Sequence, residues 1–470
     1  MREFDDRTLA GIMELTHKLA TFVRGLQFAE LPGSVRDHTL RVVRDTVGVM
    51  LAGSVLPEVR GLAELAAALG APGRATLMGR QETAAPHWAA LVNGTGAVSL
   101  ELDEGNQYAV NHPSVHIFPA VLALSEENKR SGAELLTAFV AGYEVAVRVG
   151  RATHLRDAVH PFGTHTVVGT AAAASRLLGL TVDQTVQAMQ VAAGTCIASS
   201  QTAANSGASV RNLVTGLTNQ NGLLAPLLVK AGVTGEPGAL SVIFGRILGD
   251  TFREESVASD LGQEFYITRN YFKLHACSRW NHAPIEAMTA IMARTPIPIG
   301  DVERITVWTY NPATRLSWND PPNGYGAKHS IPYNVAVRLV RGTNDLEAYS
   351  DEAVSDPDVR AMTQKVEVRE DPELTALLPD VRPARVEVKL RDGRLLSEQV
   401  QRPRGGFDNP LTEEELARKF RLLAGMAVPA PCVERLEKQL ERLPLLDDIR
   451  RLSPLLQGRE PGQRSPEGKR

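Results

Sequence analysis

Acidic side chains and a histidine stand close together in residues 90–119 (ALVNGTGAVSLELDEGNQYAVNHPSVHIFP). Three carboxylates, Glu101, Asp103 and Glu104, are followed by a Gly-Asn turn and then by His112 in the tripeptide His-Pro-Ser. A carboxylate and an imidazole in one loop can form a hydrogen-bonded acid–base pair, which is able to move a proton. A solvated acidic helix end, with a histidine that caps the next helix, is the alternative interpretation.

Two more histidines, His160 and His165, flank a Pro-Phe-Gly turn in residues 157–170 (DAVHPFGTHTVVGT). An alanine-rich helix is expected directly after them. The N-terminus of a helix offers free N–H groups and positive potential, which suit a substrate carboxylate. Ordinary turn chemistry, with Thr164 or Thr166 as the helix cap, explains the same residues equally well.

Positive charge gathers at two further places. Arg211 lies near the start of a helix rich in small residues, where a guanidinium could grip a carboxylate with two hydrogen bonds. An arginine on a helix is more often a surface salt-bridge partner.

Residues 271–282 (YFKLHACSRWNH) concentrate four basic side chains at a domain junction, namely Lys273, His275, Arg279 and His282. Such a segment suits a substrate with several carboxylates, and a solvated hinge is the alternative.

The composition is that of a globular protein without a bias toward nucleic acids or membranes. The 470 residues carry 51 Lys+Arg against 54 Asp+Glu, a net charge of −3, whereas a general nucleic-acid or membrane-surface binder carries a basic excess. No uninterrupted apolar run approaches the roughly 18 residues needed to span a bilayer. The charged start MREFDDRTLAG has no apolar signal core, so we expect a cytoplasmic location.

Sequence motifs for metals and nucleotides are missing. Cys196, Cys277 and Cys432 stand far apart without a CxxC pair, which disfavours a disulfide framework and a cysteine-rich metal site. HExxH, the phosphate loop GxxxxGK[ST] and a convincing GxGxxG are absent, and the histidines and carboxylates show no recognisable ligand spacing. We therefore expect side chains alone to carry the chemistry.

The elements that must position these side chains form a helical part with an α+β insertion. From about residue 8 to residue 250, apolar residues recur three and four apart, as in helices. The pattern changes near residue 265 and later returns to helix. The sequence thus predicts a mostly α fold with a helical domain over 1–268 and 406–456, a smaller α+β lid over 269–405 and a flexible tail over 457–470. A crevice between two domains is a usual place for a small-molecule site.

Some helix ends can be predicted from single residues. Ser34 is expected to cap the helix over 35–51, and Thr181 to cap a helix that begins directly after it. Pro119 suits the first position of a short helix. Glu144 is expected on the polar side of the helix over 132–149, opposite its apolar face.

Within the lid, alternating apolar and polar residues predict strands over 304–309 (RITVWT) and 384–390 (ARVEVKL), with another short strand at 366–368. Asp392 and Gly393 predict a tight hairpin turn between ARVEVKLR and LLSEQVQ. Helices are expected between these strands, over 283–293, 335–340 and 356–364.

Ordered blocks along nearly the whole chain resemble the MmgE/PrpD family, which includes 2-methylcitrate dehydratase, cis-aconitate decarboxylase and iminodisuccinate epimerase. The blocks are RVVRDTVGVMLAGS, ALVNGTGAVSLELDEG, NHPSVHIFPAVLAL, VHPFGTHTVVGTAAAASRLLGL, GLLAPLLVKAGVTGEPGAL, YFKLHACSRWNHAPIEA, AKHSIPYNVAVRLVRG and NPLTEEELARKFRLLAG. The resemblance implies a helical domain with an inserted α+β lid, a homodimer, and a site that needs neither a metal nor an organic cofactor.

The resemblance also implies which residues form the site. The matching residues are His112 in NHPS, His160 in VHPFG, Lys273 and His282 in KLHACSRWNH, and Tyr333 in HSIPY. Asp103 matches the second carboxylate of the family pattern D-x-D-D-T.

The chain departs from the family pattern at several of these places. Glu101 replaces the first aspartate of D-x-D-D-T, Gly105 replaces its threonine, and the loop to His112 is one residue longer. Arg211 stands where the family has a lysine, and Phe162 where it has the threonine of "HPT". Charge is kept at most of these positions, but an arginine cannot donate a proton at neutral pH. The departures therefore bear on the substrate and on the reaction.

The resemblance implies removal of a proton from a carbon next to a carboxylate, which creates an enediolate that cations must stabilise. We expect a cofactor-independent hydro-lyase acting on a small di- or tricarboxylic acid such as 2-methylcitrate. Proton transfer is assigned to His112, His160 and Asp103 or Glu101, with either histidine as the acid or the base. Binding of the carboxylates is assigned to Lys273, Arg211, Arg279, His275 and His282, and closure of the pocket to Tyr333. Epimerisation and decarboxylation are alternatives for the same groups, and a non-catalytic helical binding protein is a more distant one.

Overall fold

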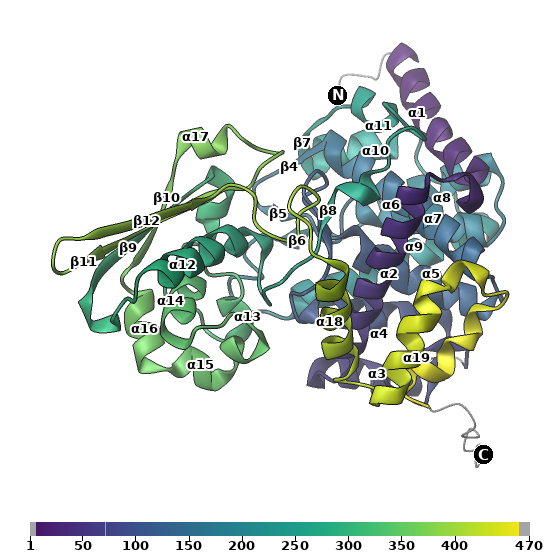
Figure 1. The fold of residues 1–470 in the computed structure, drawn as a ribbon. Helices are drawn as coiled ribbons and strands as arrows, with labels where there is room; N and C mark the ends of the chain where they lie inside the picture. The colour runs from purple at the N-terminus through teal and green to yellow at the C-terminus, as the bar shows by residue number, and fades with distance from the viewer. Residues whose placement is uncertain (1–5, 71, 460–470) are drawn as a thin grey trace.

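The computed structural model describes residues 6–70 and 72–459, with side chains from residue 15 onward. Figure 1 shows two parts side by side, a larger helical part and a smaller α+β part built from the green middle of the chain. The yellow C-terminal helices lie in the same part as the purple N-terminal ones, so both ends of the chain build the helical part, as the sequence predicts. Within the described residues, no helix combines the length and apolar character needed to cross a bilayer.

The helical part is built mainly by the first half of the chain. Its helices are α1 (Asp6–Gly25), α2 (Gly33–Ser54), α3 (Pro57–Leu69), α4 (Pro86–Ser99), α5 (Pro113–Glu127), α6 (Gly132–Ala152), α7 (Thr166–Leu177), α8 (Val182–Gly194), α9 (Val210–Lys230), α10 (Ala239–Val242) and α11 (Glu255–Ala258). A Cβ atom at Gly142 would lie 2.5 Å from the Gly169 carbonyl oxygen, and one at Gly169 2.4 Å from that of Gly142. Helices α6 and α7 therefore touch backbone to backbone, which only glycine allows.

Helix ends follow the predicted capping residues in one case and differ in two. Thr181 caps α8, and its side chain and that of Gln184 form a reciprocal capping box, as the sequence predicts. The prediction for Ser34 is wrong, because α2 already begins at Gly33, directly after Pro32. The prediction for Pro119 is also wrong, because α5 begins six residues earlier and has Pro113 in its first turn.

Pro119 lies inside α5, where it lacks the N–H that would bond the carbonyl of Val115. Asn219 on α9 replaces the missing partner, since its Nδ2 donates to the Val115 carbonyl oxygen at 2.9 Å. Its Oδ1 accepts the N–H of Ala120 at 3.1 Å, and Thr170 Oγ1 donates to the carbonyl of His116 at 2.8 Å. Side chains from two neighbouring helices thus complete the α5 ladder around the proline.

Glu144 is buried in the core rather than on a polar helix face, so that prediction is wrong. Its Oε2 lies 3.6 Å from Arg148 Nε one turn along α6, and its Oε1 accepts the N–H of Ile267 at 3.0 Å. The buried carboxylate thus contacts polar groups on α6 itself and on the segment after α11. Helical periodicity does not reveal a contact between segments that are distant in the sequence.

The α+β part contains a four-stranded sheet in the order β10-β9-β11-β12. Its strands are β9 (Val302–Thr309), β10 (Val366–Glu370), β11 (Ala384–Leu390) and β12 (Leu395–Val400). Strand β10 runs parallel to β9, and the other neighbours are antiparallel. The predicted hairpin between β11 and β12 is confirmed, and Gly393 adopts the positive φ of 91° that its turn needs.

Helices cover one face of this sheet, where the alternate residues of β11 are buried. They are α12 (His282–Arg294), α14 (Ile331–Arg341) and α16 (Pro357–Thr363), with the shorter α13 (Gly324–Ala327), α15 (Asp351–Ser355) and α17 (Pro372–Thr375) in the connections. Thus the predicted α+β character of the insertion is confirmed.

The C-terminal segment returns to the helical part as α18 (Glu413–Ala424), α19 (Ala430–Glu441) and α20 (Ser453–Leu456). Helix α18 packs on α2, where a Cβ at Gly48 would lie 3.3 Å from Phe420. Most of the predicted flexible tail, residues 460–470, lies outside the described residues. Three short strand pairs connect loops around the cavity: β3 (Gly105–Asn106) with β8 (Asn270–Tyr271), β4 (Thr153–Leu155) with β7 (Gly249–Phe252), and β5 (Val159–His160) with β6 (Ser199–Ser200). A fourth pair, β1 (Ala75–Thr76) with β2 (Thr83–Ala84), lies away from the cavity.

Candidate active site

A cavity of about 730 Å³ lies between the helical part and the α+β part. The helical part contributes the loop between α4 and α5, the segment around β5 and the start of α9, and the α+β part contributes residues 278–280, 312–316, 329 and 378–382. This volume is typical of a small-molecule site. It is the crevice between two parts at which the sequence places such a site.

The wall of the cavity is rich in positive charge. Of the described residues that line it, eight are arginines and three are carboxylates. The arginines are Arg151, Arg156, Arg211, Arg253, Arg269, Arg279, Arg315 and Arg382, and the carboxylates are Glu101, Asp157 and Asp380. A cationic cleft with low-dielectric walls concentrates anions, so the cavity suits a substrate with several carboxylates.

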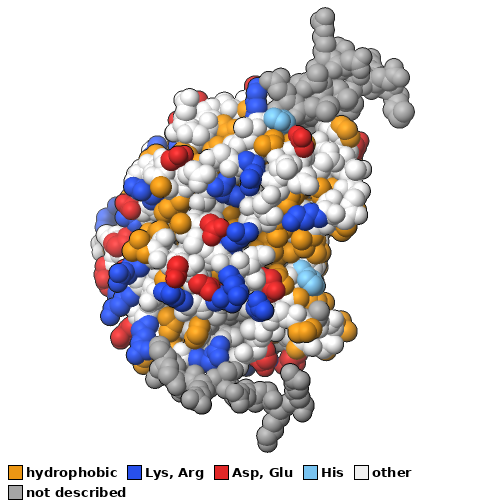
Figure 2. Space-filling model, turned by 90° about the vertical axis from the view of Figure 1, so that its right-hand side faces the viewer, with side chains coloured by type: hydrophobic (Ala, Val, Ile, Leu, Met, Phe, Trp, Pro, Cys, Tyr) orange, Lys and Arg blue, Asp and Glu red, His pale blue; other side chains and the backbone are white. Residues whose placement is uncertain are grey.

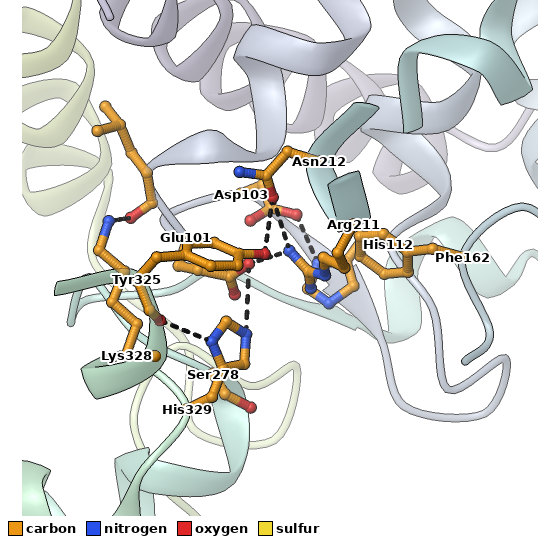
Figure 3. A network of polar contacts seen from close by, with 12 residues as sticks. Glu101, Asp103, His112, Phe162, Arg211, Asn212, Ser278, Tyr325, Lys328 and His329 are labelled. Carbon is orange, nitrogen blue, oxygen red and sulfur yellow. Dashed lines mark hydrogen bonds and ion pairs between the residues drawn. The ribbon is translucent and has the colours of Figure 1, made fainter. Parts of the chain in front are cut away.

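Glu101 lies at the centre of a buried charge network, which Figure 3 shows. It follows α4 with a φ of 57°, a left-handed conformation that is uncommon for glutamate. One carboxylate oxygen accepts from Arg211, and the other accepts from Lys273 Nζ at 2.9 Å. Burial alone would raise the pKa of Glu101, but the charges of Arg211 and Lys273 outweigh it and hold the pKa well below its usual range.

Asp103 and His112 form the acid–base pair that the sequence suggests. Asp103 Oδ2 lies 2.6 Å from His112 Nδ1, and Asp103 Oδ1 accepts from Lys273 Nζ at 3.1 Å. Burial opposes ionisation of Asp103, but His112 and Lys273 together lower its pKa to about 2. The aspartate is therefore a carboxylate at neutral pH.

His112 stands at the N-terminus of α5, and its surroundings assign its ring proton. Its Nδ1 faces two acceptors, Asp103 Oδ2 and the carbonyl oxygen of Glu104 at 2.9 Å, so Nδ1 must carry the hydrogen. Burial lowers the pKa of His112, although Asp103 opposes the shift. The ring is neutral at pH 7, and Nε2 keeps its lone pair on the side away from Asp103.

His160 carries its proton on the other ring nitrogen. The backbone N–H of Phe162 donates to His160 Nδ1 at 3.1 Å, which leaves Nε2 as the nitrogen that bears hydrogen. Burial first, and then the charge of Arg211, hold the pKa of His160 well below its usual range. His160 is thus a neutral hydrogen-bond donor on the cavity wall, whereas His112 is a hydrogen-bond acceptor.

Phe162, one of the departures from the family pattern, is the apolar support of the site. The guanidinium carbon of Arg211 lies 3.9 Å above the centre of its ring. The rings of His112 and His160 contact it edge to face, with centroids at 5.2 and 4.8 Å. The aromatic ring therefore holds the arginine and both histidines in place.

The α+β part supplies site residues that the sequence analysis missed. His329 lines the cavity, its Nδ1 donates to the Tyr325 carbonyl at 3.1 Å, and its Nε2 lies 3.7 Å from Glu101 Oε1. Tyr325 donates its hydroxyl to Asn212 Oδ1 at 2.8 Å, and Lys328 donates to the Leu100 carbonyl at 3.1 Å. Burial lowers the pKa of Lys328 to about 8. Lys328 and His329 are adjacent in the block AKHSIPY, and this pair of basic residues is the sequence signal that could have identified them as site residues.

Arg279 and Arg382 line the cavity without a carboxylate partner among the described residues. Arg279 donates to the carbonyls of Arg404 and Pro403 at 2.6 and 2.8 Å and stacks on Tyr271, with its guanidinium carbon 4.9 Å from the ring centre. Arg382 donates to the Gln107 carbonyl at 3.0 Å. Their charges remain available for an anionic ligand.

Several predicted site residues lie elsewhere. Lys273 is fully buried between Glu101 and Asp103 and does not line the cavity, so it orders the carboxylates instead of facing a ligand. The expectation that Tyr333 closes the pocket is wrong for this structure, because it is buried in α14 and its hydroxyl donates to the Ala348 carbonyl at 2.6 Å. Helical periodicity predicts that Tyr333 lies in a helix, but it does not predict which face of that helix meets the cavity.

His275 and His282 lie behind Arg279, with ring centroids 5.0 Å apart, and neither lines the cavity. Together with Glu286 they bring three ligand-type atoms within 4.8 Å of one another. Arg279 is 3.2 Å from His282 Nδ1, and both Glu286 oxygens accept the N–H of Arg404, at 2.8 and 3.1 Å. A guanidinium in contact with the group disfavours a cation there, so the cluster fits a hydrogen-bond network better than a metal site.

The chain is similar to known proteins along most of its length. The chain matches the MmgE/PrpD N-terminal domain over residues 17–245 and the MmgE/PrpD C-terminal domain over residues 275–443. It is 27% identical to a cis-aconitate decarboxylase-like protein of Aspergillus oryzae (94% of this chain, 97% of the relative) and 26% identical to cis-aconitate decarboxylase of Mus musculus (95% and 94%). It is 24% identical to 2-methylcitrate dehydratase of Escherichia coli over 52% of each chain. Both halves of the chain therefore belong to the MmgE/PrpD family.

Proposed function

We propose that the protein is a cofactor-independent lyase that acts on a small di- or tricarboxylic acid by moving a proton at a carbon next to a carboxylate. One observation carries the proposal: two neutral histidines with opposite ring protonation stand on one cationic cavity. His112 offers a lone pair on Nε2, and His160 offers an N–H on Nε2. A base and a hydrogen-bond donor are the two groups that such a proton transfer needs.

In this proposal His112 Nε2 takes the proton from the substrate carbon, and Asp103 stabilises the imidazolium that forms. The electrons of the broken C–H bond move into the adjacent carboxylate as an enediolate. Arg279 and Arg382, which have no carboxylate partners among the described residues, face the developing negative charge. Arg211 is already paired with Glu101, so it contributes mainly to the shape and potential of the wall.

Dehydration follows when the enediolate expels a hydroxyl group from the next carbon. His160 Nε2–H hydrogen-bonds the leaving oxygen, and the proton held by His112 joins it to release water. The low pKa of His160 supports a role as a donor rather than a proton-releasing acid. The favoured substrate is therefore a 2-methylcitrate-like hydroxy acid.

Decarboxylation is the second candidate, because the cis-aconitate decarboxylases match nearly the whole chain whereas the 2-methylcitrate dehydratases match about half of it. Proton NMR of the purified protein with 2-methylcitrate and with cis-aconitate in D₂O distinguishes the reactions. Loss of water gives an alkene with the full number of carboxylates, and loss of CO₂ gives one carboxylate fewer. Deuterium uptake with neither loss indicates epimerisation. Absence of all three changes across a panel of citrate-like and aspartate-derived acids would contradict the proposed lyase.

We also propose that the protein is a homodimer that uses the outer face of α9. Val210, Leu213, Leu217, Leu224 and Leu228 follow one another three, four, seven and four residues apart, and all are at least partly exposed. Figure 2 shows, on the side of the helical part away from the lid, apolar patches between charged side chains. An apolar stripe along a helix supports pairing with a second copy of the chain.

Size-exclusion chromatography with light scattering tests the dimer. Leu228→Glu on α9 is expected to give a monomer, because a charge on the stripe would be buried in the interface. Leu422→Glu on α18 is the control: this leucine is more exposed than Leu228 (68% against 39%) and lies outside the stripe, so the mass should stay unchanged. A monomeric wild-type protein would contradict the proposal.

A further inference from the structure

Gly105, in the loop between α4 and α5, and Tyr271 face each other on the strand pair β3–β8. A Cβ atom at position 105 would lie 2.3 Å from the Tyr271 hydroxyl oxygen and 2.5 Å from the ring carbon that bears it. Real Cβ atoms do not approach other atoms so closely. The tyrosine side chain therefore occupies the space that any side chain at position 105 would need, and glycine is required there.

The hydroxyl of Tyr271 makes no hydrogen bond to another described residue, and the residue as a whole is 4% exposed. Tyr271 lines the cavity. Its ring meets that of His112 nearly at a right angle, with centroids 6.1 Å apart, and Arg279 stacks on its face. The hydroxyl thus stands ready for a ligand between the proposed base and a proposed carboxylate-binding arginine.

Burial raises the pKa of Tyr271, so the hydroxyl keeps its hydrogen at neutral pH and can donate it. The family pattern that the sequence resembles has a threonine, another hydroxyl side chain, at the position of Gly105. In this chain the hydroxyl of Tyr271, on the neighbouring strand β8, occupies the space that a side chain at position 105 would fill.

We propose that Tyr271 is a substrate-contacting residue whose hydroxyl donates a hydrogen bond to a carboxylate oxygen beside the reacting carbon, in place of the hydroxyl side chain that Gly105 lacks. The ring also forms one wall of the cavity, so it limits the size of the group that the substrate carries there. This inference rests on the proposed function.

Tyr271→Phe removes a single oxygen atom and tests the donor directly. We expect kcat/KM on the substrate identified by NMR to fall about 10- to 100-fold, and the affinity for a non-reactive tricarboxylate such as tricarballylate to fall with it. The melting temperature should not decrease, because the hydroxyl makes no hydrogen bond to another described residue. Tyr310→Phe is the control, since the Tyr310 hydroxyl is buried and has no hydrogen-bond partner within the described part of the chain, and Tyr310 does not line the cavity.

A second pair of variants tests whether a hydroxyl on residue 105 can replace the hydroxyl of Tyr271. Gly105→Thr alone should lose more than 100-fold in kcat/KM, because the new side chain displaces Tyr271. In a Tyr271→Ala background the same Gly105→Thr change should instead raise kcat/KM, because it fits the vacated space and restores a hydroxyl. A structural role alone does not predict this reversal of sign.

The outcomes separate this inference from the proposed function. If the wild-type protein turns over the substrate and Tyr271→Phe has unchanged kcat, KM and tricarballylate affinity, the proposed role of Tyr271 is wrong. The proposed lyase activity is then unaffected. A wild-type protein that changes none of the polycarboxylates and does not bind tricarballylate would overturn both.

Discussion

Asp103 Oδ2 lies 2.6 Å from Nδ1 of His112, and this contact determines which nitrogen of the imidazole faces the substrate. Because Nδ1 donates to the Glu104 carbonyl and lies against the Asp103 carboxylate, the opposite nitrogen is free to act as a base. Asp103 follows α4 and His112 directly precedes α5, so the loop between these helices positions the proposed catalytic pair.

Replacing Asp103 with asparagine should preserve the fold and lower kcat about 10²- to 10⁴-fold, because an amide can donate to Nδ1 and favour the wrong tautomer. Steady-state kinetics and circular dichroism measure the two effects. Glu126→Gln is the control, since Glu126 is a buried carboxylate bonded to Thr76 and Ser453 outside the cavity. A fall of equal size in both variants would contradict the role of Asp103.

Glu101→Gln should destabilise the protein by about 3 to 5 kcal/mol, because it leaves the buried charges of Arg211 and Lys273 with less compensation. Urea unfolding measures the change. Glu413→Gln removes the partner of Arg41 and Arg44 from a carboxylate that is 56% exposed and should cost less than about 1 kcal/mol. Similar costs for the two variants would show that the Glu101 network contributes no more than a surface pair.

Stability should decrease as the pH rises from about 4.5 to 7, in part because of Glu104. Burial raises the pKa of this carboxyl from 4.5 to about 7, so the folded state binds the proton more tightly than the unfolded state over that interval. The shift corresponds to about 3 kcal/mol of stability that is present at pH 4 and lost by pH 8. Glu104→Gln should remove about that much of the difference between urea unfolding at pH 5 and at pH 8. An unchanged difference would mean that Glu104 is ionised in the folded protein.

Arg382→Gln should raise KM about 10-fold or more, because this arginine lines the cavity and its charge is not neutralised by a carboxylate among the described residues. Arg385→Gln provides a control, since that arginine pairs with Asp371 and Glu387 outside the cavity. The KM of wild type should also increase with ionic strength, as expected for an anionic substrate. A KM that is independent of both Arg382 and salt would contradict an electrostatic role for the cavity wall.

Much of the fold could be predicted from local sequence patterns. The β11–β12 hairpin follows from strand alternation around Asp392 and Gly393, and the α8 cap follows from Thr181. Pro119 shows why other boundaries could not: its place inside α5 depends on Asn219, which is distant in the sequence. Long-range partners of this kind leave no trace in helical periodicity.

The candidate site, too, could be predicted only in part from local sequence. Asp103 and His112, in the loop between α4 and α5, stand out because carboxylates and a histidine lie close together in a short segment. The placement of Lys273 behind them, and of His329 and Tyr271 around them, depends on how β8 and the α+β part meet that loop. The meeting of two domains is set by packing rather than by local spacing, so these roles required the structure.

Exchange of the substrate C–H in D₂O tests the central claim most directly, because it reports removal of the proton itself. Wild-type protein, His112→Asn and the control His87→Asn, a histidine outside the cavity, would each be followed by proton NMR with the accepted polycarboxylate. We predict exchange or turnover with wild type and His87→Asn, and a loss of at least about 10²-fold with His112→Asn in a protein of unchanged circular dichroism. Proton loss at the wild-type rate in His112→Asn would contradict the account.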